Sequence, residues 1–276
     1  MQTGTVNYHF KTDARQAYVI DAGGVTGELV SPPHDVRRIS VRDIKAQEAE
    51  VSFAKDSVAF RDAPSAERAF GEDRNWIAGY DRELAALLSA ELGAQECVIF
   101  DHTVREDDPE ATRRPARNVH SDYSPEGAQQ RLVDVLGAER AAEWRKGRFG
   151  FVNVWRPVGR PINSAPLGFV RPSTTGPEDW ILIDLIYPDR RGHIMGLVAS
   201  DAHEWVYASK MTPDEVAIFN IYDSAGLPSV GHSAIDLVED PSVQTIRKSI
   251  ESRTLVRYRA DPAPSWHRFH SDAGRA

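Results

Sequence analysis

The sequence predicts a mostly β protein with flanking helices, whose short strands close into an antiparallel sandwich or barrel. Between residues 148 and 259, short runs rich in β-branched and aromatic residues alternate with Pro, Gly and Asp turns. No Gly-rich phosphate loop follows any of these runs, which argues against a nucleotide-binding fold of alternating strands and helices.

The elements are expected in a definite order along the chain. Alternating apolar residues near the N-terminus indicate short strands, whereas residues 63–93 and 125–146 have the apolar spacing of helices. The predicted strands lie within 17–24, 37–44, 51–60, 96–105, 148–158, 180–188, 193–200, 204–209, 215–224 and 248–259.

We expect a single domain over residues 1–276. Residues 1–95 form a helical and loop-rich N-terminal part, residues 96–260 form the β core, and residues 261–276 form a loosely held tail. The charged, Pro-bearing stretch 106–119 is expected to be a loop that closes over a site.

Composition excludes several classes of protein. One cysteine, Cys97, allows no disulfide framework and favours a reducing compartment, the cytoplasm. A net charge of -8 argues against a nucleic-acid partner. The N-terminus lacks the pattern of a signal peptide, and no apolar run reaches the length of a membrane span. The composition does not determine the oligomeric state, so a homo-oligomer is allowed.

The stretch "VHSDYS" contains a candidate metal-binding pair, His120 and Asp122. Residues two apart on an extended segment point the same way, so both side chains can bind one ion. Two His and one carboxylate bind iron in oxygenases and leave the other coordination positions open. The alternative is a polar loop with a hydrogen-bonded histidine. His270 and Asp272 have the same spacing, but they lie in the expected tail with no His after them.

Three downstream histidines compete to complete the metal site. His193 follows a charged turn, and His203 lies at a strand edge, where it can support a ligand or simply pack. His232 follows Gly231, which permits close backbone approach.

A carboxylate-binding strand is expected shortly after His232. Arg247 and Ser249 share one strand face, and so do Glu251 and Arg253. An Arg fork with a neighbouring hydroxyl can hold the carboxylate of 2-oxoglutarate. Arg253 competes with Arg247 for this role, and an edge strand with a solvated face is the structural alternative.

These segments resemble a known family. In order along the chain, the motifs are "FDHTVR" (100–105), "VHSDYSPEGA" (119–128), "NVWRP" (153–157), "DLIYPDR" (184–190), "HEWVYA" (203–208), "MTPDEVAIFNIYDS" (211–224), "GHSAI" (231–235) and "RKSIESRTLV" (247–256). The set resembles the hydroxylase/desaturase family that includes the cephamycin methoxylation protein and the fungal gibberellin desaturase. The resemblance runs from about residue 35 to residue 258.

The resemblance implies a double-stranded β-helix (jelly-roll) core and an Fe(II)/2-oxoglutarate-dependent oxygenase that uses O2. The substrate would be a small-molecule natural-product intermediate, which is hydroxylated, desaturated or cyclised. It also implies roles for nine residues: His120, Asp122 and His232 as iron ligands; Arg247 and Ser249, or Arg253, at the 2-oxoglutarate carboxylate; and Asn153, Trp155 and Arg156 as substrate-pocket candidates. Ordinary core packing is the alternative for Trp155. Tyr222, at the end of the strand before His232, is a further pocket candidate, and its alternative role is to orient the loop that carries this histidine.

Two departures from the family pattern bear on the substrate. The family has Lys at the position of Asn220 and Arg at that of Glu204, which suggests a pocket or rim for a different molecule. Two other functions stay open: a cupin-like metalloenzyme that does not use 2-oxoglutarate, and a non-catalytic partner of a tailoring enzyme.

Overall fold

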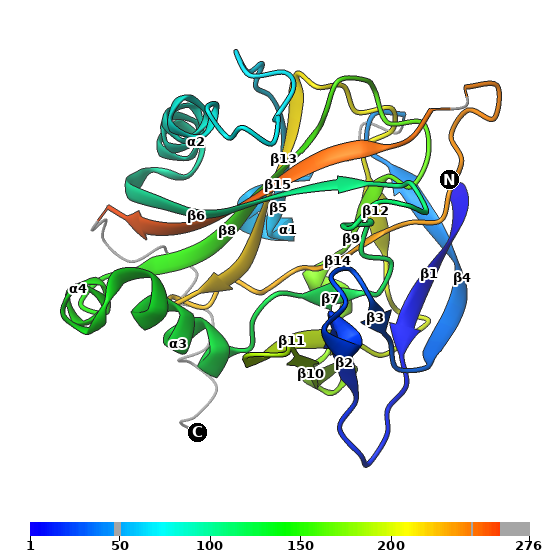
Figure 1. Cartoon of the computed structure of the whole chain (residues 1–276), viewed down its shortest axis with the longest axis horizontal. Helices are drawn as coiled ribbons and strands as arrows, with labels where there is room; N and C mark the ends of the chain where they lie inside the picture. Colours follow the sequence, from blue (N-terminus) through cyan, green and yellow to red (C-terminus); the bar gives the residue numbers. More distant parts are fainter. Residues whose placement is uncertain (47–50, 244, 260–276) are drawn as a thin grey trace, which may run out of the picture.

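Two antiparallel-dominated sheets face each other across one apolar core (Figure 1). The computed structural model describes residues 1–46, 51–243 and 245–259. The core between the sheets contains Phe151, Trp155 and Phe219 from one sheet, with Phe169 and Val206 from the other. This arrangement confirms the predicted mostly β class with a jelly-roll core.

The smaller sheet has five strands, and all its neighbours pair antiparallel. Every residue of β8 is buried, because this strand lies in the middle of the sheet between two covered faces. In sheet order the strands are β5 (Val58–Asp62), β13 (Glu215–Asp223), β8 (Phe149–Pro157), β15 (Lys248–Tyr258) and β6 (Ala94–Glu106).

The larger sheet has ten strands and holds the segments around the HxD pair and the distal histidine. In sheet order they are β1 (Gln2–His9), β4 (His34–Asp43), β12 (Trp205–Tyr207), β9 (Leu167–Val170), β14 (Gly231–Ala234), β7 (His120–Ser121), β11 (Arg191–Leu197), β10 (Trp180–Ile186), β2 (Ala17–Ile20) and β3 (Leu29–Val30).

Helices cover the smaller sheet and one end of the molecule. The long helix α2 packs Tyr80, Leu84 and Leu88 against the outer face of the five-stranded sheet. Figure 1 shows α3 and α4 together at the end opposite β1 and β4. The helices are α1 (Phe53–Asp56), α2 (Ile77–Leu92), α3 (Pro125–Leu136) and α4 (Ala138–Trp144), with 3₁₀ turns η1 (Ala22–Gly24), η2 (Pro172–Thr174) and η3 (Pro177–Asp179).

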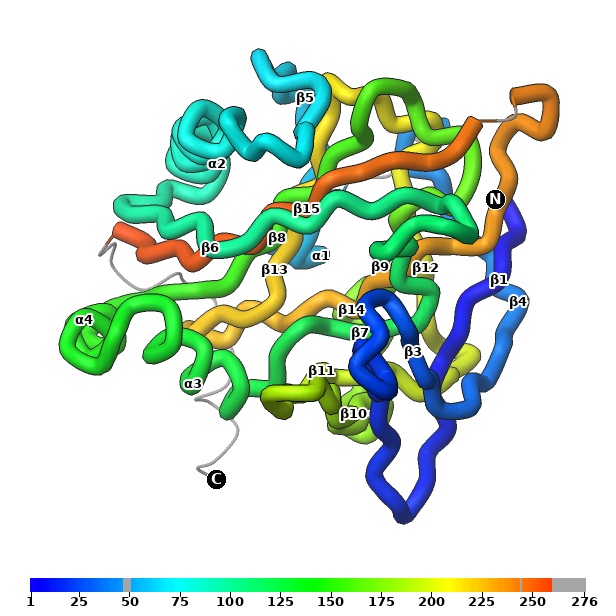
Figure 2. Tube along the Cα trace, in the orientation of Figure 1, coloured from blue at the N-terminus to red at the C-terminus, as the bar shows by residue number. Residues whose placement is uncertain are grey.

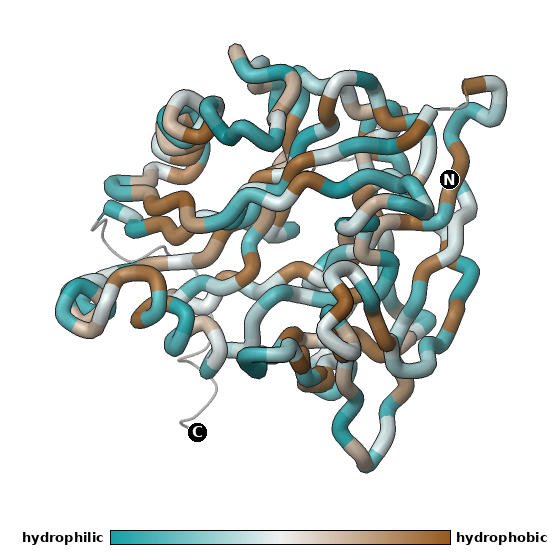
Figure 3. The backbone as a smooth tube through the Cα atoms, viewed as in Figure 1, coloured by the Kyte–Doolittle hydropathy of each residue, from teal (hydrophilic) through white to brown (hydrophobic). Residues whose placement is uncertain are grey.

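Most predicted elements are present, with two differences. Residues 63–76 are not helical, so the expected helix 63–93 begins only at Ile77. The expected strand 51–60 is divided between α1 and β5 by Ser57, which has a left-handed backbone. In Figure 3 apolar and polar residues follow one another along the strands, as strands with two different faces require.

The first 95 residues contribute more to the sheets than a helical and loop-rich part would. Strands β1 to β4 lie in the larger sheet, and β5 pairs with β13 in the smaller one. The expected tail 261–276, with His270 and Asp272, lies outside the described residues.

Candidate metal centre and co-substrate site

The structure brings His120, Asp122 and His232 together. Strands β7 and β14 lie side by side (Figure 2), and His232 stands directly opposite His120 in the ladder. Opposite residues project from the same face of a sheet, and the two imidazole centroids are 4.5 Å apart. One potential ligand atom from each residue lies within 4.8 Å of the other two.

Backbone carbonyls orient both imidazoles. His120 Nδ1 lies 2.8 Å from the carbonyl oxygen of Asn118, and His232 Nδ1 lies 3.3 Å from that of Val230. A carbonyl only accepts, so each Nδ1 carries the proton and each Nε2 has a free lone pair. The Nε2 of His232 is buried and has no hydrogen-bond partner among the described residues.

Two side chains from the smaller sheet fix the carboxylate. Oδ2 of Asp122 accepts hydrogen bonds from Asn153 Nδ2 and Arg253 Nε, both at 2.9 Å. Burial alone would raise the pKa of Asp122, but Arg253 and the neighbouring histidines hold this pKa well below its usual value. The carboxylate is therefore ionised at neutral pH, and its Oδ1 is 3.6 Å from His120 Nε2.

The protonation states suit Fe(II). Burial lowers the pKa of His120 to about 4 and also lowers that of His232, so both imidazoles are neutral at pH 7. Two neutral imidazole nitrogens and one carboxylate oxygen are the donor set of non-haem iron sites. Asp122 and His232 are buried, whereas the side chain of His120 is 12% exposed, which leaves one side of the cluster accessible.

A serine pair links the two strands that carry these ligands. Ser121, between His120 and Asp122, is fully buried, and its hydroxyl lies 2.6 Å from that of Ser229. Ser229 stands three residues before His232. This hydrogen bond therefore joins the β7 ligand pair to the loop that leads into β14.

Arg253 is occupied by protein carboxylates. Besides Asp122, it contacts Asp101 through Nη1 at 2.7 Å and Glu251 through Nη2 at 2.7 Å. All three arms of its guanidinium are thereby paired. The interaction with Asp122 makes Arg253 a support for the candidate metal ligand.

Arg247 and Ser249 have unused hydrogen-bonding groups. Arg247 is 4% exposed and Ser249 is 1% exposed. Nε and Nη1 of Arg247 and the hydroxyl of Ser249 are buried without a partner among the described residues. The guanidinium lies over the ring of Trp155, 5.3 Å from its centroid. Burial, with help from the nearby charge of Arg105, lowers the pKa of Arg247 to about 9, the signature of a buried cation that lacks an anion.

The other predicted pocket residues occupy different places. Asn153 and Trp155 face the core, whereas Arg156 lies on the opposite face of β8. There Arg156 donates hydrogen bonds to the carbonyls of Ala63 and Pro213, so the structure does not bring it to the metal cluster. The hydroxyl of Tyr222 accepts a hydrogen bond from Gln129 at the α3 end of the core, and no contact joins it to the three candidate ligands.

The two departures from the family pattern do not line the metal cluster. Asn220 is fully buried, and its amide donates to the carbonyls of Leu227 and Pro228, which supports the loop before His232. Glu204 is exposed. The side chain of Asn220 therefore supports the loop that leads to His232, and its effect on a substrate pocket stays a prediction.

The rival histidines have other partners. His193 is 42% exposed and contacts Asp184, and His203 lies between Tyr8 and Asp179.

Three charged residues of this site were not predicted from the sequence: Asp101, Arg105, and Glu251 in its ion pair with Arg253. Asp101 and Arg105 lie in the motif "FDHTVR", and β6 pairs antiparallel with β15, opposite Arg253 and Ser249. The available signal was that Asp101 and Arg105, four residues apart on a predicted strand, share one face. The sequence does not specify whether that face points toward the core.

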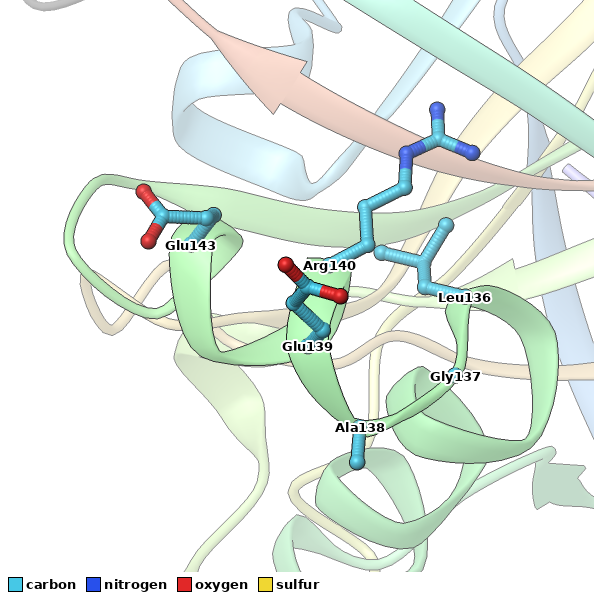
Figure 4. A pocket seen from close by; sticks show the side chains of 6 residues that line it. All are labelled: Leu136, Gly137, Ala138, Glu139, Arg140 and Glu143. Carbon is cyan, nitrogen blue, oxygen red and sulfur yellow. The ribbon is translucent and has the colours of Figure 1, made fainter.

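A shallow hollow between α3 and α4 is a separate surface feature (Figure 4). It is lined by Leu136, Gly137, Ala138, Glu139, Arg140 and Glu143, and none of the candidate ligands borders it. No helix in the described part of the chain combines the length and the apolarity that a membrane span requires.

Comparison with known proteins identifies the family. A family model described as an oxidoreductase/YMDC permease-like domain matches residues 6–257. The chain is 29% identical to the hydroxylase/desaturase efuI of Hormonema carpetanum, over 81% of this chain and 84% of that protein. It is 32% identical to the Fe(II)/2-oxoglutarate-dependent dioxygenase nvfI of Aspergillus novofumigatus, over 69% of this chain and 70% of the relative.

A solved structure agrees with the fold. The iron and alpha-ketoglutarate-dependent endoperoxidase NvfI superposes with a TM-score of 0.82 at 24% identity, over 93% of this chain and 98% of that one. The chain belongs to this oxidoreductase family, that of the hydroxylase/desaturase proteins, and is an Fe(II)/2-oxoglutarate-dependent dioxygenase.

Proposed function

We propose that His120, Asp122 and His232 hold Fe(II), and that Arg247 with Ser249 binds the distal carboxylate of 2-oxoglutarate. The metal assignment rests on one observation: two imidazoles present Nε2 beside an ionised carboxylate, with all three donor atoms within 4.8 Å of one another. Iron bound there would supply activation of O2 with oxidation of the 2-oxo acid.

The co-substrate assignment follows from hydrogen-bond inventories. Arg253 already forms ion pairs with Asp122 through Nε, with Asp101 through Nη1 and with Glu251 through Nη2. Arg247 and Ser249 have unpaired, buried donors two residues apart. A carboxylate in this position would accept two bonds from the Arg fork and one from the hydroxyl. This favours Arg247 over Arg253 as the carboxylate-binding arginine.

The remaining residues would position the reacting groups. Asn153 and Arg253 hold Oδ2 of Asp122, which leaves Oδ1 for the metal. Trp155 packs its ring against Arg247 and excludes water from that side. Fixed orientation of ligands and exclusion of water are the contributions that a protein makes in such a site.

The substrate proposed is a small-molecule intermediate of natural-product biosynthesis. The names of the relatives support this class: one is a hydroxylase/desaturase, and another is an aspirochlorine biosynthesis protein of Aspergillus oryzae, 32% identical over 49% of this chain. Hydroxylation, desaturation and cyclisation are the reactions proposed, and substrate positioning would select among them. The single cysteine keeps the cytoplasm as the proposed location.

Iron binding tests the metal assignment. Anaerobic titration of metal-free protein with Fe(II) should give one bound ion per chain in the wild type. His120→Ala, Asp122→Ala and His232→Ala should each lose it, because three protein ligands are the minimum set here. His193→Ala removes an exposed histidine and should bind as the wild type does. Retained stoichiometric binding in all three ligand variants would refute the assignment.

The two alternative functions that the sequence left open predict different results. A cupin-like metalloenzyme that does not use 2-oxoglutarate would bind iron but would tolerate loss of Arg247 and Ser249 during turnover. A non-catalytic partner protein would show no O2 uptake. The orphaned donors of Arg247 argue against the cupin-like alternative, because a buried cation without an anion is costly unless a ligand completes it.

A further inference from the structure

A third arginine, Arg105, projects into the same site from β6. In the antiparallel ladder Arg105 stands directly opposite Ser249, and Asp101 stands opposite Arg253. Directly opposite residues project from one face, and residues two or four apart on a strand share it. Arg105 therefore lies on the sheet face that carries Ser249 and Arg253, between the metal end and Arg247.

Most of the donors of Arg105 are unused. Its Nη1 donates to the carbonyl of Arg114 at 2.9 Å, and within the described ranges it forms no ion pair. A guanidinium has five N–H donors, so four are left. Arg253, by contrast, is paired with three carboxylates. Arg105 is thus placed as a donor for a group that the protein does not itself supply.

The carboxylates that interact most with the charge of Arg105 lie at the metal end of the site. Burial lowers its pKa, and the groups that favour its charge are Glu251 and Asp122. Its charge in turn lowers the pKa of both His232 and Arg247. These couplings agree with the ladder, in which Arg105 stands opposite Ser249, between Arg253 at the metal end and Arg247.

The charges of the site support a role in binding an anion. Asp101, Asp122 and Glu251 are balanced by three cations, Arg247, Arg253 and Arg105. Fe(II) and the 2-oxoglutarate dianion would balance each other. With Fe(II) and the dianion both bound, the site would then be neutral, whereas without Arg105 the loaded site would carry one net negative charge.

We propose that Arg105 is a second arginine of the co-substrate site and donates hydrogen bonds to the 2-oxo acid end of 2-oxoglutarate, next to the metal. Arg247 and Ser249 then hold the opposite end, so this inference rests on the proposed function. Two arginines would fix the co-substrate at both ends and set its orientation at the iron. Arg105 would also join co-substrate binding to the loop 107–118 through the carbonyl of Arg114.

Anaerobic absorbance titration of the Fe(II) protein with 2-oxoglutarate tests this inference. The charge-transfer band of a metal-bound 2-oxo acid reports both affinity and the surroundings of the 2-oxo end. Arg105→Gln should weaken 2-oxoglutarate binding about tenfold or more, since it removes a charge-assisted bond, and should shift the band. Arg105→Lys keeps the charge and should recover part of the affinity. Arg247→Gln should weaken binding without shifting the band.

Arg114→Gln is the matched control, because its side chain is exposed and its carbonyl stays available to Arg105. An affinity of Arg105→Gln within twofold of the wild type would overturn the inference. Weaker binding with an unshifted band would overturn the placement at the metal end. A wild-type protein that gives no band, or an Arg247→Gln variant that binds normally, would instead refute the proposed function.

Discussion

At the scale of single residues, backbone carbonyls decide which nitrogen each candidate ligand offers. The Asn118 and Val230 carbonyls hold the Nδ1 protons of His120 and His232, so Nε2 is free in both. Each carbonyl belongs to the residue two before the histidine. The peptide that leads into each ligand therefore also sets its tautomer, and iron binding needs no proton shift on either ring.

The hydrogen bond between Ser121 and Ser229 should contribute to iron affinity. We expect Ser121→Ala and Ser229→Ala each to weaken Fe(II) binding about tenfold, the usual cost of losing a group that supports metal ligands. The double variant should bind no worse than either single one, because both changes remove one interaction. Iron dissociation rates measured with a chelator, with exposed Ser173→Ala as control, check this. Additive losses would contradict it.

Glu239 should make stability depend on pH. Burial, with the nearby charge of Asp43, raises the pKa of Glu239 to about 7. In the unfolded chain this carboxyl ionises nearer its ordinary value of 4.5. Between about pH 4.5 and pH 7 the folded state therefore holds a proton that the unfolded state has lost. The free energy of unfolding is highest below this range, and the contribution of Glu239 is lost as the pH rises through about 7.

Glu239→Gln should remove that dependence. Between pH 5 and pH 8 the unfolding free energy of the wild type should fall by about 1–3 kcal/mol more than that of the variant. The Gln side chain can still accept the hydrogen bond from the Lys210 amide. Urea unfolding at several pH values, with exposed Glu110→Gln as control, measures the difference. Parallel pH curves for wild type and Glu239→Gln would rule out this role.

The candidate ligands could be selected from the sequence, but their partners could not. His120 and Asp122 stand two apart, and His232 was one of three downstream options. Nothing local shows that Asn153 and Arg253 share Oδ2 of Asp122, since they lie 31 and 131 residues away from it. Such pairs arise only when the two sheets close on each other.

At the scale of elements, the loop 107–118 is tied to the co-substrate side of the site. The amide of Asp107 donates to the carbonyl of Arg247 at 2.8 Å, and the side chains of Asp107 and Arg117 form a two-point ion pair. The turn at Gly27 lies against Thr112 of this loop. A ligand that orders Arg247 would therefore also restrict the motion of this loop.

Trypsin cleavage should report closure of this loop. Arg113 and Arg114 are exposed at its tip, so cleavage there should slow when Fe(II) and 2-oxoglutarate are added, because ligands stabilise the closed form. Cleavage after Arg190, in an exposed turn between β10 and β11, is the internal control and should not change. Equal rates at the loop with and without both ligands would show that it does not close.

Two elements were misjudged because local backbone conformation overrides apolar spacing. The pattern 63–93 reads as one helix, but Phe70 and Arg74 have positive φ angles of 50° and 56°, which a helix cannot contain. The single left-handed residue Ser57 likewise separates α1 from β5. Period and composition do not reveal such positions in non-glycine residues.

At the scale of the whole molecule, strands from the two ends of the chain build each sheet. β1 and β4 are neighbours in the larger sheet, where β4 pairs with β12, and β5 pairs with β13. The strand pattern predicted the class and the jelly-roll core. It did not predict which strands pair, because β2, β4 and β5 each have a partner more than 100 residues away.

On the proposed function, this fold holds 2-oxoglutarate between the metal triad and Arg247. The most direct measurement is anaerobic titration of the Fe(II)-loaded protein with 2-oxoglutarate, followed by visible absorbance. The wild type should develop a charge-transfer band that saturates at one equivalent. Arg247→Gln should need at least about tenfold more 2-oxoglutarate, and exposed Arg259→Gln should match the wild type. Iron bound without any such band would contradict the account.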